Sequence, residues 1–411
     1  MKAVQTEQLV PQEHWGLTPW IDAQDHEGEA RVRAPAESSI SWRERFLTRV
    51  GSGVLSGITF GDWLKLLRET GFAVDPPYWP RAAFISLSSL ANSAFAWYEN
   101  KVYGPKLRAV TIPPPLFILG VWRSGTTHLQ NLLAVDPRFA YCSFYEAYYP
   151  HTFLCTQKLA ARSIAALLPK HRPQDNMRLG LDTPDEDEVA ACLLTGRSIL
   201  LSLVFPRLTA HYERYLTFRR ATKDEVNQWK AAMVWFLKKL TWKHRRPLVV
   251  KSPEHTGRIR LLLELFPDAR FLHIHRHPYD VFLSARHTVQ RVIQYCQLQH
   301  LVLDDLDGTI IRQYKELYEP FFEERSLIPE GRLCEVRFSD LEHDPLGQMR
   351  QIYEALDLPD FAAMATALRR YVRSVAAYRR NEYPPLPPAL RRRVASEWRR
   401  SFEAWDYAAN L

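Results

Sequence analysis

The sequence predicts an α/β fold in which a phosphate-loop-like parallel β-sheet is flanked by helices, with a helical N-terminal segment and a helical insertion. Short apolar runs that could form buried strands recur from residue 116 onward, and amphipathic patterns follow the first three runs. The first run leads directly into a glycine-containing loop and then a helical pattern. Short apolar strands that alternate with helices form parallel sheets with helices on both faces.

Residues 1–110 are expected to form a helical N-terminal segment packed on the rest of the chain. Phe60–Gly71 places apolar side chains near one face and ends on a glycine that can cap a helix. Ala82–Tyr98 is the longest apolar-leaning stretch, but serines and an asparagine interrupt it, so it does not predict a membrane span. The pattern favours a buried helix over an element lying on a membrane surface.

Residues 111–360 are expected to form the α/β core, with a helical insertion at about 184–243, whose aromatic and leucine content suits a cap that binds an acceptor molecule. The expected strands are Leu116–Leu119, Leu248–Val250, Phe271–His275 and Leu333–Phe338. The expected helices after the first three are His128–Ala134, Thr256–Phe266 and Asp280–Tyr295. Residues 361–411 are expected to form a basic, helical C-terminal segment.

The composition indicates a folded chain with an anionic partner. Hydrophobic residues make up 46% of the 411 residues, enough for a packed core. The 54 Lys and Arg against 46 Asp and Glu give a net charge of +8, and 41 of the cations are arginine, which suits forked recognition of phosphate. No nucleic-acid-binding motif is recognisable, so no nucleic acid partner is predicted. The five scattered cysteines, without a CxxC pair, favour a reducing, cytoplasmic location.

The first candidate anion site is the loop Gly120–Thr127, between an expected strand and helix. Gly125 allows close approach of the backbone, and the amides that follow lie at a helix N-terminus. The loop resembles a Walker A motif, but Thr126 stands where that motif has the lysine that holds a triphosphate. Arg123 supplies a cation instead, which suits a single phosphate with an anionic group attached. The candidate binding residues are Arg123, Ser124, Gly125, Thr126 and Thr127.

The second candidate anion site follows the expected strand Phe271–His275. Arg276 ends the strand and Ser284 lies on the next helix, so a guanidinium and a hydroxyl can converge on one anion.

With these motifs the chain resembles the sulfotransferases that use 3′-phosphoadenosine 5′-phosphosulfate (PAPS). RSGTT at 123–127 resembles their 5′-phosphosulfate loop, and RHPYDVFLS at 276–284 their 3′-phosphate motif. VVKSPEH at 249–255 is similar to the KSPxH segment of the bacterial-type branch, and VRFSDL at 336–341 to a further strand motif. The resemblance implies transfer of a sulfuryl group, without a metal, to a hydroxyl or amine of an apolar or aromatic small-molecule or lipid acceptor.

The resemblance also implies catalytic roles. Arg123 and Lys251 would neutralise the charge of the transferred and leaving groups. Two residues are candidates for the general base. Glu146, a carboxylate expected to have a raised pKa, is favoured over His255, which lies four residues after Lys251 rather than two as in the cytosolic branch.

Other patterns have simpler explanations. His273, His275 and His277 alternate along a strand end without a carboxylate or cysteine to complete a metal site, so packing or nucleotide contact is expected. The acidic run 182–188 is interpreted as a helix start, with Thr183 and Glu186 forming a capping box. Asp182 and Glu186 remain candidates for the acceptor site. A peripheral membrane contact of the chain stays open. The alternatives to a sulfotransferase are a phosphate-loop kinase and a non-catalytic basic binding protein, either a nucleotide-binding scaffold or a binder of membranes or nucleic acid.

Overall fold

The computed structural model describes residues 47–409, apart from residues 170, 173, 176 and 302–304. The described residues belong to one compact unit. The first 46 residues of the predicted N-terminal segment lie outside the described residues. The boundaries of the three predicted segments stay a prediction.

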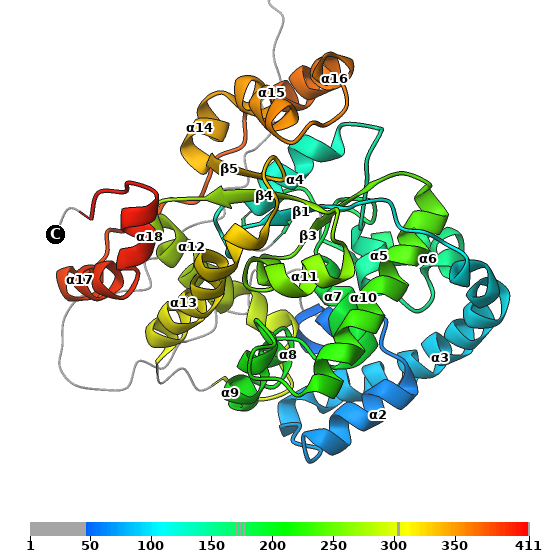
Figure 1. Cartoon of the computed structure of the whole chain (residues 1–411). Coiled ribbons are helices and arrows are strands. Elements are labelled where there is room, and N and C mark those ends of the chain that lie inside the picture. The colour runs from blue at the N-terminus through cyan, green and yellow to red at the C-terminus, as the bar shows by residue number, and fades with distance from the viewer. Residues whose placement is uncertain (1–46, 170, 173, 176, 302–304, 410–411) are drawn as a thin grey trace, which may run out of the picture. The chain divides into compact units, whose positions relative to one another are not determined.

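Five parallel strands form the sheet, in the order β2–β3–β1–β4–β5 (Figure 1). They are β1 (Leu116–Leu119), β2 (Ala140–Tyr141), β3 (Leu248–Lys251), β4 (Arg270–His275) and β5 (Leu333–Arg337). The four predicted strands are confirmed to within one residue at each end. β2 was not predicted, because two residues are too few to show a pattern.

The described helices of four or more residues alternate with these strands or flank them. They are α2 (Phe60–Glu69), α3 (Trp79–Arg108), α4 (Thr126–Ala134), α5 (Phe144–Tyr148), α6 (Phe153–Leu167), α7 (Asp187–Thr195), α8 (Leu201–Val204), α9 (Thr209–Tyr212), α10 (Lys223–His244), α11 (Ile259–Leu265), α12 (Pro278–Val292), α13 (Leu306–Glu324), α14 (Phe338–His343), α15 (Pro345–Ala355), α16 (Phe361–Ser374), α17 (Pro388–Glu397) and α18 (Arg399–Ala404). The helix predicted from Thr256 begins later, at Ile259, because Pro253–Gly257 forms the short 3₁₀-helix η6.

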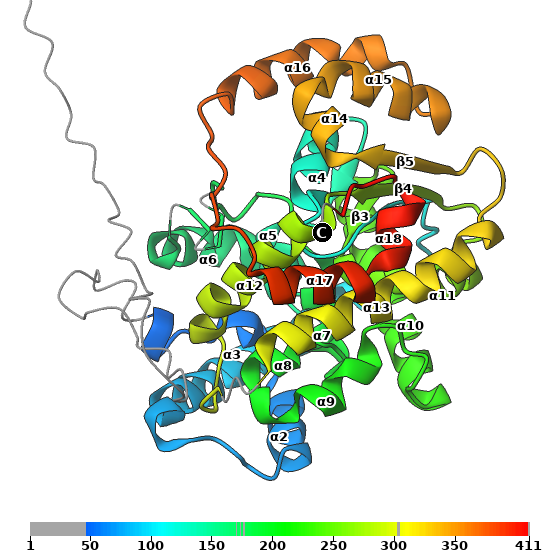
Figure 2. The ribbon, with the colours of Figure 1, turned by 90° about the vertical axis from the view of Figure 1, so that its left-hand side faces the viewer.

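Helices cover both faces of the sheet. Phe117 and Leu119 of β1 belong to a large buried cluster that includes side chains of α7, α10, α11 and α13. Leu116 and Ile118, which point to the opposite face, pack with α4, α15 and α16. Figure 2 shows α15 and α16 on one side of β4 and β5, with α13 on the other. Burial on both faces explains why the central strand β1 is continuously apolar.

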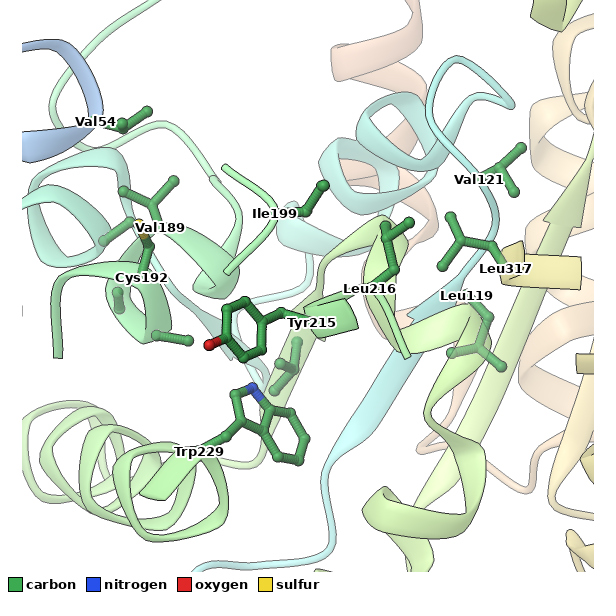
Figure 3. Close-up of a cluster of buried hydrophobic side chains, with 14 of the residues drawn as sticks. Val54, Leu119, Val121, Val189, Cys192, Ile199, Tyr215, Leu216, Trp229 and Leu317 are labelled. Atoms are coloured by element: carbon green, nitrogen blue, oxygen red, sulfur yellow. The ribbon is translucent and has the colours of Figure 1, made fainter. Parts of the chain in front are cut away.

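The inserted helices α7–α10 use their aromatic side chains for packing. Tyr215 and Trp229 have no exposed surface, and they pack near Val189 and Cys192 of α7 (Figure 3). The aromatic content of the insertion therefore builds the core at these positions.

The prediction that Ala82–Tyr98 forms a buried helix is wrong in one respect. The stretch lies within α3, but its largest apolar side chains are exposed: Leu87 is 71% and Trp97 67% exposed. Serines and other polar groups occupy the inward side instead, because they hydrogen-bond to neighbouring elements. No helix among the described residues is both long and apolar enough to cross a membrane.

The central strand β1 lies between β3 and β4, and Ile118 pairs with both Lys251 and Leu272. Because all five strands are parallel, the segments that follow β1, β3 and β4 meet at one edge of the sheet. The residues predicted from the two phosphate-binding motifs and from KSPEH lie in these segments.

Candidate active site

The segment after β1 forms a turn whose backbone requires glycine. Gly125 has a φ of +109° and stands as the N-cap residue of α4. The first N–H groups of α4 have no partner within the helix and are available to an anion. The turn is attached to the segment after β3, because the Gly120 N–H donates to the Thr256 hydroxyl (2.8 Å). The predicted strand–loop–helix arrangement is confirmed.

Gly125→Ala is expected to lower the free energy of unfolding by at least about 2 kcal/mol, because it adds strain at positive φ and a steric clash. A Cβ at this position would lie 2.3 Å from Cδ2 of Phe338. Gly331→Ala is the matched control, since Gly331 has a φ of +74° but open space around it. Urea denaturation measures both variants. Equal losses would mean that the Phe338 ring moves aside without cost.

Arg123 connects the two predicted anion-binding segments. Its φ of +70° is unusual for a residue with a side chain, and such conformations concentrate at functional sites. The guanidinium donates through Nε to the Ser284 hydroxyl on α12 (2.9 Å) and through Nη1 to Asp175 (2.9 Å). Arg123 therefore holds the phosphate loop, α12 and the loop that follows α6 together.

Arg276, which follows β4, lies against the same loop. Its Nη1 donates to the Arg123 carbonyl (3.4 Å), and its Nη2 is 3.3 Å from Asp280. Its Nε is buried without a partner, which leaves one donor for a ligand. Burial lowers the pKa of Arg276, and the positive charges of Arg380 and Arg123 lower it further. Arg123 therefore contacts Ser284 through its side chain and Arg276 through its carbonyl.

The sequence prediction missed a third arginine, Arg380. It lies on the extended connection between α16 and α17, residues 376–387, which we call the strap. The guanidinium carbons of Arg380 and Arg276 lie 5.7 and 4.9 Å from the centre of the Phe338 ring. Arg380 is 3.1 Å from Glu342, so one salt bridge already satisfies part of its charge.

The strap contacts the loop that carries Asp175 and helix α12. The Tyr378 hydroxyl donates to the Asp175 carbonyl (2.8 Å), and the Tyr383 hydroxyl lies 3.3 Å from that of Ser284. No local pattern in the sequence indicates these contacts, since they join residues about a hundred or more positions apart.

Lys251 ends β3, beside the phosphate loop. Its side chain is 1% exposed, and its Nζ donates to Glu186 (2.8 Å), whose side chain is 23% exposed. Asp185 is close to this pair. Burial raises the pKa of Asp185, the charge of Lys251 opposes the shift, and Glu186 adds to it. The structure therefore brings a buried cation and two carboxylates to the edge of the sheet where the two anion-binding segments meet.

The predicted capping box at the acidic run is wrong. α7 begins at Asp187, with Glu186 as its N-cap residue. Thr183 instead donates to the Gly180 carbonyl (2.6 Å), and Pro184 pairs with Ser143 in an isolated bridge. The helix begins later because residues 183–185 are held by pairing with the segment after β2.

This later start brings consecutive acids of α7 against the segment after β3. Asp187 accepts from Ser252 (2.8 Å) and pairs with His255 (2.8 Å), while Glu188 pairs with Arg258 (2.6 Å). Burial raises the pKa of Asp187, but the contacts with His255 and Ser252 lower it more, so the net shift is downward. His255 has no exposed surface, and the pair fixes the position of α7 relative to β3.

Glu146 lies in a different environment from the one expected. It is buried, caps α5 through Ser143, and pairs with Lys243 (2.6 Å) and His244 (2.7 Å) of α10. Burial raises its pKa, but hydrogen bonds and charge from His244 and Lys243 outweigh this and lower the pKa to about 2. The expected raised pKa is therefore wrong.

The remaining candidates are also located. Asp182 is exposed, and its carboxylate lies 3.4 Å from the Gln157 side chain. The hydrogen bond of Lys251 goes to Glu186, not to Asp182. His273 and His275 serve packing: their rings stack on Phe321 and Trp405. His277 accepts from the Tyr279 N–H and caps α12. All five cysteines are free.

The sequence and the fold both have known relatives. A model of the sulfotransferase family matches residues 114–362. Over 352 residues the chain is 36% identical to the omega-hydroxy-beta-dihydromenaquinone-9 sulfotransferases Stf3 of Mycobacterium bovis and Mycobacterium tuberculosis. These alignments cover 85% of this chain and 90% of each relative.

Crystal structures of two mycobacterial sulfotransferases have the same fold. STF1 of Mycobacterium tuberculosis matches with a TM-score of 0.60 at 19% identity, covering 82% of this chain and 91% of that one. STF9 of Mycobacterium avium matches with a TM-score of 0.57 at 20% identity, covering 84% and 96%.

Proposed function

The chain is an enzyme of the sulfotransferase family, and we propose that it moves a sulfuryl group from PAPS to a hydroxyl of a largely apolar acceptor. The observation that carries this proposal is the grouping of Arg276 and Arg380 around Phe338, beside Arg123 of the phosphate loop, with Lys251 at the neighbouring strand end. Three arginines and a lysine suit a small nucleotide with several negative charges.

The described residues fit PAPS, which carries anions at two ends. The N–H groups at the start of α4, together with Arg123, would hold the 5′-phosphosulfate. Arg276, Ser284 and Arg380 would hold the 3′-phosphate, and the unpartnered Nε of Arg276 supports this assignment. Arg380 would supply a cation from the C-terminal part of the chain.

Bound PAPS supplies a sulfuryl group that passes in line to the acceptor oxygen while the bridging oxygen leaves with the nucleotide. Lys251, desolvated at the end of β3, would stabilise negative charge on the leaving oxygen. We propose Glu186, rather than Glu146 or His255, as the base that accepts the acceptor proton. Glu186 contacts Lys251 and is partly exposed, whereas Glu146 and His255 are enclosed by structural ion pairs.

We propose that the acceptor is lipid-like, such as a prenylated quinone carrying a hydroxyl. The relatives that are 36% identical are named for sulfation of omega-hydroxy-beta-dihydromenaquinone-9. The test is incubation of the protein with PAPS and a set of hydroxylated lipids, phenols and amines, followed by mass spectrometry. Sulfation of lipid hydroxyls in preference to soluble phenols and amines is expected. Transfer only to soluble acceptors would contradict the proposed acceptor.

Calorimetry separates this proposal from the kinase alternative. We expect 3′-phosphoadenosine 5′-phosphate to bind without magnesium and ATP to bind much more weakly, since Thr126 replaces the lysine that holds a triphosphate. Equal affinity for the two nucleotides would contradict the proposed donor.

Arg276→Ala and Arg380→Ala are each expected to weaken binding of 3′-phosphoadenosine 5′-phosphate by about 10- to 100-fold, the value of a charged hydrogen bond. The matched control is Arg379→Ala, because Arg379 is an exposed neighbour of Arg380 on the same strap. Calorimetry measures all three affinities. If Arg379→Ala costs as much as Arg380→Ala, the strap contributes only general positive charge.

A further inference from the structure

Helix α3 presents polar side chains, together with the buried Ile85 and Leu107, to the protein. Arg81 has no exposed surface and donates to the carbonyls of Gln297 (2.8 Å) and Gln294 (3.0 Å). About three helical turns further along, Asn92 donates to the Ser56 and Ile58 carbonyls (both 3.0 Å). These hydrogen bonds fix the rotation of α3 about its own axis.

The outward side of α3 is apolar and aromatic over most of its length. Its large exposed side chains are Trp79, Leu87, Leu90, Phe95, Trp97 and Tyr98. At 3.6 residues per turn, positions 87, 90, 94, 97, 98 and 101 follow one side of the helix. We call this side, with its flanking Trp79 and Phe95, the outer face. The exposure of this apolar side is unusual, because the apolar side of a surface helix usually faces the core.

The charge on α3 is entirely positive where it is exposed. Lys101, Lys106 and Arg108 lie near the C-terminal end, and the Lys101 Nζ is 5.1 Å from the centre of the Trp97 ring. Glu99, the one acidic residue of the helix sequence, is buried and paired with Lys239. The outer face therefore combines apolar side chains, tryptophan and tyrosine with cations and no exposed carboxylate.

We propose that the outer face of α3 lies on the surface of a bilayer that contains anionic lipids. Leucine and aromatic side chains enter the boundary between headgroups and acyl chains, tryptophan and tyrosine favour that boundary, and lysine and arginine reach the headgroup phosphates. A second copy of the chain would instead present an equally cationic face. Because buried polar contacts hold the inward side of α3 against the protein, the helix would lie along the membrane surface and not enter the bilayer.

This inference goes beyond the proposed function and does not depend on it. A lipid acceptor would be concentrated at the same surface, but binding of the protein to vesicles requires neither donor nor acceptor. If the protein does not bind vesicles, the proposed sulfuryl transfer still stands. If it does not transfer a sulfuryl group, the proposed membrane contact still stands.

The test is co-sedimentation of the full chain with vesicles of phosphatidylcholine alone or mixed with phosphatidylglycerol. We expect stronger binding to the mixed vesicles. The combined variant Leu87→Ser, Leu90→Ser and Trp97→Ser should weaken binding at least about tenfold, and Lys101→Gln about fivefold. The matched control is Leu327→Ser, because Leu327 is an exposed leucine (43%) in the short helix η8 (Arg325–Leu327), outside the outer face. Circular dichroism checks that each variant is folded.

A benzophenone amino acid placed at Leu87 identifies what contacts the outer face. Crosslinks to phospholipid support the proposal. Crosslinks to a second copy, or to residues 1–46 of the same chain when vesicles are present, would overturn it. Equal sedimentation of the triple-serine variant and the unmodified chain would also overturn it.

Discussion

Replacing Lys251 with methionine is expected to lower kcat by about 10²–10³-fold while leaving the affinity for the product nucleotide nearly unchanged. Lys251 is a desolvated cation that ends the strand beside the phosphate loop. A cation in this position stabilises charge that develops on the leaving oxygen more than charge present in the bound donor. Loss of this cation therefore lowers kcat. Steady-state kinetics measures kcat, and calorimetry measures the affinity for the nucleotide.

The matched control for this variant is Lys239→Met. Lys239 is also fully buried and paired with a glutamate, Glu99, but it lies between α10 and α3. Burial lowers the pKa of Lys239 to about 8, while Glu99 opposes the shift. Both variants remove a buried ion pair, so both should lower stability. If the two variants lower kcat equally when both are measured below their melting temperatures, the effect of Lys251→Met is structural.

Glu186→Gln is expected to reduce kcat by about 10²–10⁴-fold, the usual contribution of a general base, without weakening nucleotide binding. The glutamine keeps the size of the side chain and an acceptor for Lys251 but cannot take a proton. Single-turnover measurements with saturating donor isolate the transfer step. If instead Asp185→Asn removes activity and Glu186→Gln does not, the base is Asp185, the neighbouring carboxylate with the raised pKa.

Glu146→Gln is the control that separates the two assignments of the base. Its carboxylate pairs with Lys243 and His244, so the substitution should lower the free energy of unfolding by about 2 kcal/mol and retain most of the turnover. Because its folded-state pKa is about 2, below the unfolded value, this stability is present above about pH 4.3 and is lost as the pH falls toward 2. Loss of turnover in a stable Glu146→Gln protein would restore Glu146 as the base.

The strands and the two anion-binding segments could be predicted because their signals are local. A strand buried on both faces, such as Leu116–Leu119, is apolar throughout, and a turn that needs positive φ selects glycine at position 125. Parallel pairing then brings the strand ends to one edge, where Arg123 contacts both Ser284 and Arg276.

Two of the errors share one cause, which is pairing between distant residues. Thr183 and Glu186 have the spacing of a capping box, but pairing with the segment after β2 delays the helix to Asp187. Glu146 has the chemistry of a base, but α10 supplies Lys243 and His244 from nearly a hundred residues away and lowers its pKa.

The sequence by itself determined the class of fold, the phosphate loop and the class of reaction, because each depends on residues close together in the chain. Only the tertiary structure decided which carboxylate adjoins Lys251, that Arg380 lies near Arg276, and which side of α3 faces outward. These depend on burial and on partners 60 to more than 200 residues away, which change the pKa and the exposure of a side chain without leaving a pattern in its own segment.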